Sequence, residues 1–426
     1  MSAAETRPAA KAQRMLLRYS MFGTALAFAG PPIYIHTPRL YADLHGLGLA
    51  TVGAILLGLR ILDFGQDPLL GCWISRTKMA KRTIAKVFAV ALGSGALALF
   101  APDPMFDGRL WLALSLAVVF TSFSGLQILF YSAGVSLVEQ GGGAVTHDRI
   151  AGWRETGVFA GICAACVVPL ALGSVFGEGV GFMAFTVVFC LFLAYATYRM
   201  RDIWPAGLAV NHEVQPVSGL GSLFQDRGIR RLLLVGLLNA LPGGLTSTLF
   251  LFFVEDRLQA GNHTGPMLLL FFASAGLATP FWSKAAIRFG PKVVMLYGML
   301  AAISAFLWAL TLGAGDWPAF YLISAASGAA LGADMTLLPA MLSRRLATTG
   351  LDSSQAFGVW GLINKVSLAV AAGVALPLIG YAGFAPGPGN TEAALSALAI
   401  AYAGAPCVLK AIAAALLFMT PISKEA

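Results

Sequence analysis

The sequence predicts an all-α integral membrane protein with twelve transmembrane helices, arranged as two bundles of six. An apolar composition, twelve apolar segments and an alternation of basic loops lead to this fold class. Hydrophobic residues make up 58% of the 426 residues and charged residues only 11%, against about 25% charged residues in soluble proteins. A soluble domain must wet its own surface and cannot hide so much apolar area. The composition therefore excludes a soluble globular protein.

Each of the twelve apolar segments is near or above the roughly 20 residues that cross a bilayer as a helix. The predicted spans are 19–40, 49–74, 84–101, 110–138, 150–173, 179–198, 231–254, 265–288, 292–313, 317–342, 355–381 and 392–419. The first span is long and lacks a small-residue cleavage site, so we expect an uncleaved helix and not a signal peptide.

Lysines and arginines mark one side of the membrane. They gather in the N-terminal tail and after spans 2, 4, 6, 8 and 10, whereas the opposite loops hold only Arg39, Arg109 and Arg257. The positive-inside rule therefore places both termini in the cytoplasm. This distribution also explains the net charge of +8, which does not indicate nucleic-acid binding. We expect a protein of the bacterial inner (plasma) membrane that functions as a monomer.

The polar stretch 199–230 is the longest in the chain and contains the flexible composition "NHEVQPVSGLGS". We expect an N-terminal bundle at 1–198, a cytoplasmic linker at 199–230 and a C-terminal bundle at 231–426. "DPLLGCWISRTKMAKR" after span 2 and "TPFWSKAAIRFGPK" after span 8 share a proline, a tryptophan and a basic loop. Two matching halves of six helices are typical of the major facilitator fold, whose substrate site lies near mid-membrane between the halves.

Three charges interrupt span 2 in "RILDFGQDPLLG". Arg60, Asp63 and Asp67 lie at i, i+3 and i+7 and so share one helix face. Two poorly hydrated carboxylates one turn apart repel each other, and a bound Na⁺ or proton relieves that repulsion. We predict a cation-coupling site at Asp63 and Asp67, the metal ligands if the ion is Na⁺, with Arg60 balancing charge. The alternative is a structural Arg–Asp interaction with a helix-end turn at Pro68.

A polar stripe on span 4 consists of Thr121, Ser124, Gln127 and Tyr131, at spacings of 3, 3 and 4. Such a stripe has two readings. It would supply oxygens to a cation and hydrogen bonds to a substrate, or it would only join helices by hydrogen bonds worth about 0.6 kcal/mol each.

Span 11 carries Trp360, Asn364 and Lys365, which we expect to contact substrate or take part in coupling. A lysine inside the membrane needs a partner, and Asp334 of span 10 or a span 2 aspartate would balance its charge. A structural ion pair is the alternative. Lys410, near the end of span 12, is expected to reach the membrane interface.

The other reactive side chains indicate no resident cofactor. The chain has five cysteines, all in apolar runs where packing is their expected role, the Cys163–Cys166 pair included. No His/Cys/carboxylate cluster has the spacing of metal ligands, and no nucleotide-binding motif occurs in the sequence. We expect no enzyme activity.

The span 2 segment is similar to the R-x-x-D-x-x-x-D-P-x-x-G signature of the glycoside–pentoside–hexuronide:cation symporters, typified by the melibiose permease. "YSMFGTALAFAG", "FYSAG", "WRETG" and "FGVWGLINKVSLAVAAG" resemble further family segments in spans 1, 4, 5 and 11. The resemblance implies that Asp63 and Asp67 serve Na⁺, Li⁺ or H⁺, helped by the Ser124 hydroxyl. It also implies that Lys365 lies near both cation and sugar, and it matches a family arginine to Arg154.

The chain departs from the melibiose permease at several matched positions. Gln66 of the predicted cation site replaces an asparagine, Ala27 and Gln127 replace two sugar-binding aspartates, and Tyr131 replaces a tryptophan. The two aspartates matched to cation binding, Asp63 and Asp67, are retained, but the two aspartates that bind the sugar are not. This difference argues against melibiose as the cargo. An amide and a phenol still bind hydroxyl groups, and the basic residues would favour an anionic substrate.

These features predict a cation-coupled (Na⁺ or H⁺) secondary transporter of a small polar, sugar-like solute that works by alternating access. The alternative on the same fold is a carrier of an amphiphile or lysolipid. Two alternatives without transport are an intramembrane aspartyl protease, whose dyad would be Asp63 and Asp334, and a sensor on a transporter scaffold. The i, i+4 placement of the span 2 aspartates and the twelve spans disfavour the protease.

Overall fold

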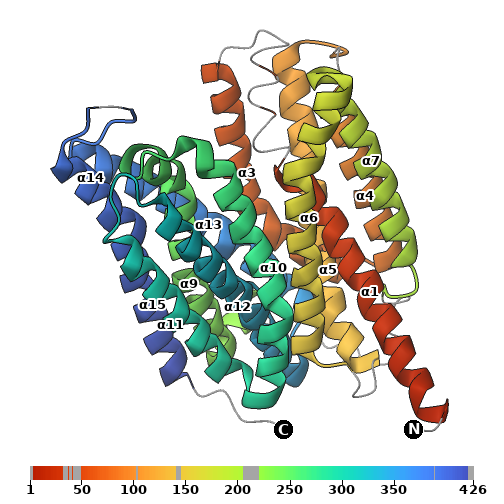
Figure 1. Ribbon diagram of the computed structural model, residues 1–426. Coiled ribbons are helices and arrows are strands. Elements are labelled where there is room, and N and C mark those ends of the chain that lie inside the picture. Colours follow the sequence, from red (N-terminus) through yellow and green to blue (C-terminus); the bar gives the residue numbers. More distant parts are fainter. Residues whose placement is uncertain are drawn as a thin grey trace. The chain divides into compact units, whose positions relative to one another are not determined.

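The computed structural model consists of α-helices joined mostly by short loops (Figure 1). It describes residues 3–31, 37, 41, 49–101, 104–140, 145–204, 220–387 and 389–420. At some helical positions, Arg60 among them, only the backbone is described. Within these residues no strand occurs, which confirms the all-α prediction.

The chain divides into two compact units. Unit 1 comprises Met1–Leu220 and Gly350–Leu362, and unit 2 comprises Gly221–Thr349 and Ile363–Ala426. The boundary at Leu220 falls inside the stretch predicted as a linker. The segment Gly350–Leu362, which the sequence assigned to the second bundle, belongs to unit 1. The predicted limits of the two bundles and of the linker remain a prediction.

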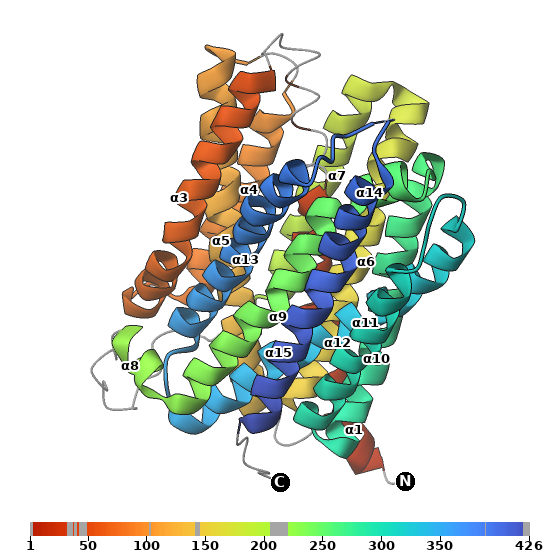
Figure 2. The same ribbon diagram turned by 90° about the vertical axis from the view of Figure 1, so that its left-hand side faces the viewer.

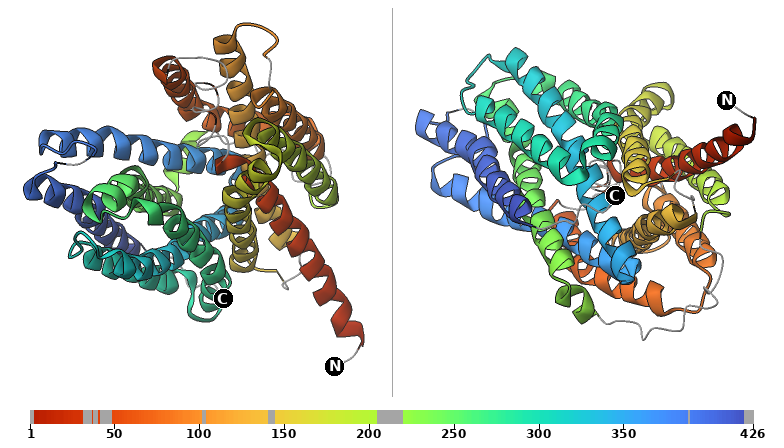
Figure 3. Two further views of the ribbon diagram at one scale, coloured as in Figure 1. Left: turned by 45° about the horizontal axis from the view of Figure 1, so that its top comes forward. Right: turned by 90° about the horizontal axis from the view of Figure 1, so that it is seen from below.

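In the described part of unit 1 there are six long helices. They are α1 (Ala3–Pro31), α3 (Leu49–Arg76), α4 (Lys81–Leu99), α5 (Gly108–Gln140), α6 (His147–Phe176) and α7 (Glu178–Arg199). Helix α1 packs along α6, as both views of Figure 3 show. Gly157 and Gly161 of α6 permit this approach, since a Cβ at either position would overlap a backbone carbonyl of α1.

Unit 2 begins with α8, whose first residue is the last of unit 1, and contains most of the remaining elements. They are α8 (Leu220–Gln225), α9 (Arg227–Phe252), the π-helix η2 (Phe253–Arg257), the 3₁₀-helix η3 (Gly261–His263), α10 (Thr264–Phe289), α11 (Pro291–Ala309), α12 (Trp317–Thr349), α14 (Glu392–Ala399), the π-helix η4 (Ile400–Gly404) and α15 (Ala405–Met419). Helices α9 and α15 lie side by side (Figure 2). Helix α13 (Ser353–Tyr381) begins in unit 1 and continues into unit 2.

Within the described residues, ten helical segments are long and apolar enough to cross a membrane. They coincide with predicted spans 3 to 12, although span 10 continues to Thr349. Helix α3 contains predicted span 2, whereas α1 contains residues 19–31 of predicted span 1, and most of the rest of that span lies outside the described residues. Helix α1 begins at Ala3, inside the basic tail that precedes the predicted span. Large apolar side chains are exposed on the spanning helices, such as Leu277 of α10 at 81% and Phe418 of α15 at 72%. Lipid is the solvent that suits such a surface.

Each unit has its own apolar core. In unit 1 the Phe22 ring lies 5.4 Å from Phe130 and 5.3 Å from Trp204, measured between ring centroids. In unit 2 the rings of Phe253 and Tyr402 stack at 4.3 Å. Both cores are built from side chains of several helices, so each unit can hold a site in a fixed geometry.

Candidate functional site

Asp63 lies on α3 where this helix packs along α5, and its side chain is 6% exposed. Two groups donate to its Oδ1: the Ser124 hydroxyl of α5 at 3.5 Å, and the Gln66 amide one turn further along α3. Thr121 Oγ1 of α5 donates to Gln66 Oε1 at 2.9 Å. A chain of four polar side chains therefore joins the acidic face of α3 to the polar stripe of α5. We call Asp63, Gln66, Thr121 and Ser124 the α3–α5 network.

Asp67 lies one turn further along α3 and is 1% exposed. Its neighbour is the first part of α13 in unit 1. A Cβ built on Gly358 would lie 2.6 Å from the Asp67 carbonyl oxygen, and one built on Gly361 would lie 2.5 Å from Asp67 Oδ2. The two aspartates share the predicted helix face, but the contacts described for them involve different helices.

Arg154 and Glu155 form a second buried cluster, at the cytoplasmic end predicted for α6. Arg154 is 2% exposed, and its Nε donates to Glu155 Oε1 at 2.6 Å. The guanidinium lies 4.0 Å from the centroid of the Tyr131 ring, and the Tyr131 hydroxyl donates to the same Glu155 oxygen at 3.4 Å. Within the described residues Arg154 Nη2 has no hydrogen-bond partner. A guanidinium with an unused donor suits an oxygen-bearing ligand.

Glu155 was missing from the predicted site. Its position directly after Arg154 in "WRETG" is the only signal in the sequence, because a buried arginine needs a counter-charge and the adjacent carboxylate is the nearest candidate.

In unit 2, the partner of Asp334 differs from those that we expected. Asp334 of α12 and Lys410 of α15 are 7% and 6% exposed, and their charged groups form an ion pair. Lys410 is therefore not an interfacial lysine, and Asp334 is not the partner of Lys365, contrary to one of our two alternatives. The other alternative, a pair between Lys365 and a span 2 aspartate, remains a prediction. Hydropathy placed Lys410 near a helix end, where snorkelling is common, but the helix packing places it beside a buried carboxylate.

A family model described as MFS/sugar transport protein matches residues 18–424. The chain belongs to this family. Its fold is the major facilitator fold, as predicted, and the chain is an integral membrane transporter and not an enzyme. This excludes the intramembrane protease. No curated protein sequence matches the chain.

Solved transporter structures share the fold of this family member. A bacterial homologue of the iron transporter ferroportin, in its outward-facing state, is 14% identical with a TM-score of 0.72 and covers 96% of this chain and 98% of its own. The fucose:proton symporter FucP of E. coli is 11% identical with a TM-score of 0.72 and covers 97% and 99%. At these identities the likeness shows the fold alone.

The other predicted site residues of this transporter fall in both units. Gln127 of α5 is half-buried, and Trp360 of α13 is 9% exposed, both in unit 1. Asn364 and Lys365, also half-buried, belong to the part of α13 in unit 2. The Arg60 side chain, predicted to balance charge, lies outside the described residues.

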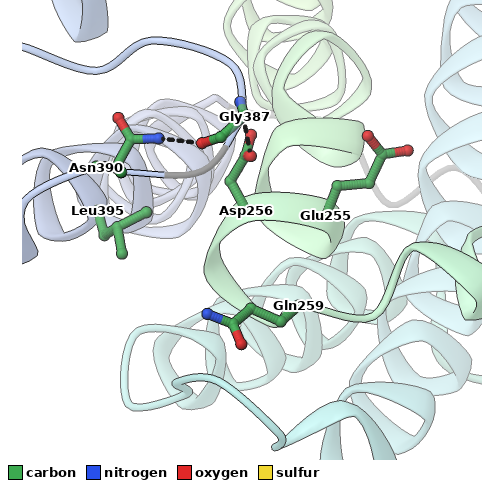
Figure 4. A pocket seen from close by; sticks show the side chains of 7 residues that line it. Glu255, Asp256, Gln259, Gly387, Asn390 and Leu395 are labelled. Carbon is green, nitrogen blue, oxygen red and sulfur yellow. Dashed lines mark hydrogen bonds between the residues drawn. The ribbon is translucent and has the colours of Figure 1, made fainter.

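Unit 2 also has a surface pocket of about 330 Å³ (Figure 4). Its lining consists of Glu255, Asp256, Gln259, Gly387, Gly389, Asn390 and Leu395. Asp256 Oδ1 accepts from the Gly387 amide at 3.0 Å, and Asn390 Nδ2 donates to the Gly387 carbonyl at 2.9 Å. These bonds fix a loop, and the lining contains no predicted site residue.

Proposed function

We propose that this transporter couples the movement of a small polar, sugar-like solute to Na⁺ or H⁺ by alternating access. The α3–α5 network is the observation that carries the proposal. It surrounds a buried carboxylate, Asp63, with a hydroxyl and an amide from residues that the sequence selected independently. A charge inside the membrane is costly, so such groups mark ion and substrate pathways.

The network offers hard oxygen atoms to a small cation. Asp63 supplies the carboxylate and Ser124 the hydroxyl, and oxygen donors of this kind suit Na⁺. Gln66 Oε1 accepts from Thr121, and it would reach a cation beside Asp63 after a rotation of the amide. Among the described residues no group of three or more His, Cys, Asp or Glu side chains is placed to hold a metal. The network contributes the Asp63 carboxylate, and Asp67 lies one turn further along α3. A monovalent ion between them, or a proton on either, would relieve their repulsion.

Substrate recognition is proposed for the Arg154 cluster. Arg154 Nη2 and the Tyr131 hydroxyl are donors that bind hydroxyl or carboxylate oxygens, and the Tyr131 ring, 5.1 Å from Phe357, offers an apolar face to a sugar ring. Gln127 from α5, and Trp360, Asn364 and Lys365 from α13, complete the proposed substrate-binding set. A guanidinium at this position favours acidic sugars over neutral ones.

A carrier of an amphiphile or lysolipid is the second candidate. Ala27 stands where the melibiose permease has a sugar-binding aspartate, and a Cβ at Gly161 of α6 would lie 3.0 Å from the Ala27 methyl group. A methyl group at this position offers no hydrogen bond to a sugar hydroxyl, which supports an apolar cargo over a sugar. From the basic loops, both termini are proposed to be cytoplasmic, in a bacterial inner membrane, with the monomer as the working unit.

Uptake by the purified protein in proteoliposomes tests the proposal. Radiolabelled neutral sugars, uronates and lysolipids would be offered with an imposed Na⁺ or proton gradient. We expect accumulation of a sugar or uronate that depends on one of the two gradients. Accumulation of the lysolipid alone would favour the second candidate, and uptake that ignores both gradients would contradict cation coupling.

The variants Asp63→Cys and Asp67→Cys should abolish gradient-driven accumulation. Asp107→Cys is the matched control, because Asp107 is an exposed carboxylate that accepts from backbone amides at the start of α5. If both site variants still concentrate the substrate normally, the coupling role of the two aspartates is wrong.

A further inference from the structure

The first ten residues of α13 lie against the end of α3 in unit 1, and glycines permit this close approach. A Cβ built on Gly71 of α3 would lie 2.5 Å from the Ser354 carbonyl oxygen, and one built on Gly358 of α13 would lie 2.6 Å from the Asp67 carbonyl oxygen. Both contacts involve backbone atoms. These two glycines therefore allow two helix backbones to meet, as small residues do in membrane proteins.

Gly361 differs, because the atom that it faces belongs to a charged side chain. Its Cβ would lie 2.5 Å from Asp67 Oδ2 and 3.3 Å from Asp67 Cγ. Cβ atoms in proteins do not approach other heavy atoms within 3.0 Å, so a methyl group at position 361 would displace the Asp67 carboxylate. The space left by the absent side chain is occupied by a carboxylate that the cation site is proposed to use.

Gly361 also lies next to Trp360 and four residues before Lys365, both in the proposed substrate-binding set. A hydrogen bond from Gln355 Nε2 to Ser75 Oγ at 3.2 Å fixes the start of α13 against α3 two turns away. The Asp67 carboxylate is therefore in contact with the backbone of the helix that carries these groups.

We propose that Gly361 is a positioning residue for cation coupling. By leaving room for the Asp67 carboxylate against α13, it makes cation occupancy and the position of α13 depend on each other. A cation held between the aspartates draws the Asp67 carboxylate toward Asp63, one turn away, and this changes its contact with Gly361. The inference rests on the proposed function, since it assigns to a neutral residue a part in the same cation site.

The test compares Gly361→Ala with Gly373→Ala in the purified full-length protein. Gly373 lies on the same helix, and no atom of the described residues lies within 4 Å of a Cβ built there, so the control adds the same methyl group in open space. The melting temperature in detergent would be followed during titrations with Na⁺, Li⁺ and protons. The measured quantity is the cation concentration that gives half of the maximal rise in melting temperature. In Gly361→Ala we expect it to increase about tenfold, which corresponds to a loss of about 1.4 kcal/mol in binding free energy. In Gly373→Ala it should stay within about twofold of the wild type.

A purely structural role for Gly361 predicts a lower melting temperature with an unchanged half-saturating cation concentration, and that result would overturn the proposal. If Gly361→Ala does not fold, it is combined with Asp67→Ala, which removes the clashing carboxylate. Folding of the double variant would show that the methyl group at position 361 clashes with the Asp67 carboxylate, as the proposal requires, and failure of the double variant contradicts it. A wild-type protein that no cation stabilises would overturn the proposed cation site as well, so the two failures are distinguishable.

Discussion

Asp63 and Asp67 have one sequence pattern but different surroundings. Spacing of i and i+4 on α3 placed both carboxylates on one face, and both are buried as predicted for that face. The described contacts of Asp63 involve α5, whereas those of Asp67 involve α13. Spacing determines which face of its own helix a residue occupies, but it does not determine which helix packs there. The different environments of the two carboxylates could therefore not be predicted.

Ser124→Ala should weaken cation binding modestly. The Ser124 hydroxyl donates to Asp63 at the long distance of 3.5 Å, and one hydrogen bond contributes about 0.5–1.5 kcal/mol. We expect the half-saturating cation concentration to rise by about two- to tenfold, measured by cation-dependent melting.

Ser132→Ala is the matched control for this change. Ser132 lies on the same helix, is equally buried, and donates to the Leu129 carbonyl of its own helix at 3.0 Å. Equal effects of the two variants on cation binding would contradict a role for Ser124 in the site.

At the scale of elements, the sequence predicted the helices well and their neighbours poorly. Ten of the spans predicted from the length of apolar segments coincide with observed helices. The prediction succeeds because a segment in lipid must form hydrogen bonds between its own backbone groups, which only a helix of sufficient length does. The pairing of Lys410 with Asp334 depends on how α15 is rotated and shifted against α12. No local pattern reports that arrangement, so Lys410 resembled an ordinary lysine near a helix end.

The Asp334–Lys410 pair should stabilise unit 2 only as a pair. Lys410→Met leaves Asp334 buried without its counter-charge, which we expect to cost about 3–5 kcal/mol. Adding Asp334→Leu should recover most of the loss, because replacing a whole buried pair by apolar side chains is often neutral. Melting temperatures of the wild type, both single variants and the double variant measure the coupling. A double variant as unstable as the sum of the singles would contradict direct pairing.

The start of α9 should make unit 2 sensitive to acid. Asp226 accepts from the Ile229 amide at 2.8 Å and from Arg345 of α12 at 3.2 and 2.7 Å. The hydrogen bonds from Arg345 hold the pKa of Asp226 below its usual value. The carboxylate therefore contributes stability above its unfolded pKa of about 3.9, and this stability is lost as the pH falls through the lower folded pKa.

Asp226→Asn should keep the helix cap and lose the charge pair, because asparagine also caps helices well. We expect a flatter dependence of melting temperature on pH below about 4 than in the wild type, whose carboxylate becomes protonated as the pH falls through its lowered pKa. Identical acid profiles of the two proteins would show that the pair with Arg345 contributes nothing to the pH dependence.

At the scale of the whole molecule, α13 is the long helix whose two parts belong to different units. Its first part carries Trp360 and contacts Asp67 within unit 1, and its second part carries Asn364 and Lys365 within unit 2. If the proposed coupling holds, a helix that belongs to both units would transmit a change at Asp67 to residues of the second unit through its own backbone. Alternating access needs such a connection, because a ligand shifts a conformational equilibrium only through its different affinity for the two states.

Coupling through this connection must be reciprocal. If the cation raises the affinity for substrate by some factor, substrate must raise the affinity for the cation by the same factor. We expect about five- to 150-fold for the wild type, the range of a coupling free energy of 1–3 kcal/mol. Asp63→Asn should bring the factor to about one, since a neutral amide has no charge for the cation to compensate.

Calorimetric titration of the purified protein measures both affinities. The titrations use the substrate identified by the uptake panel, with and without Na⁺. Substrate affinity of the variant without cation should match that of the wild type, and a coupling factor that survives in Asp63→Asn would place the coupling site elsewhere than in the α3–α5 network.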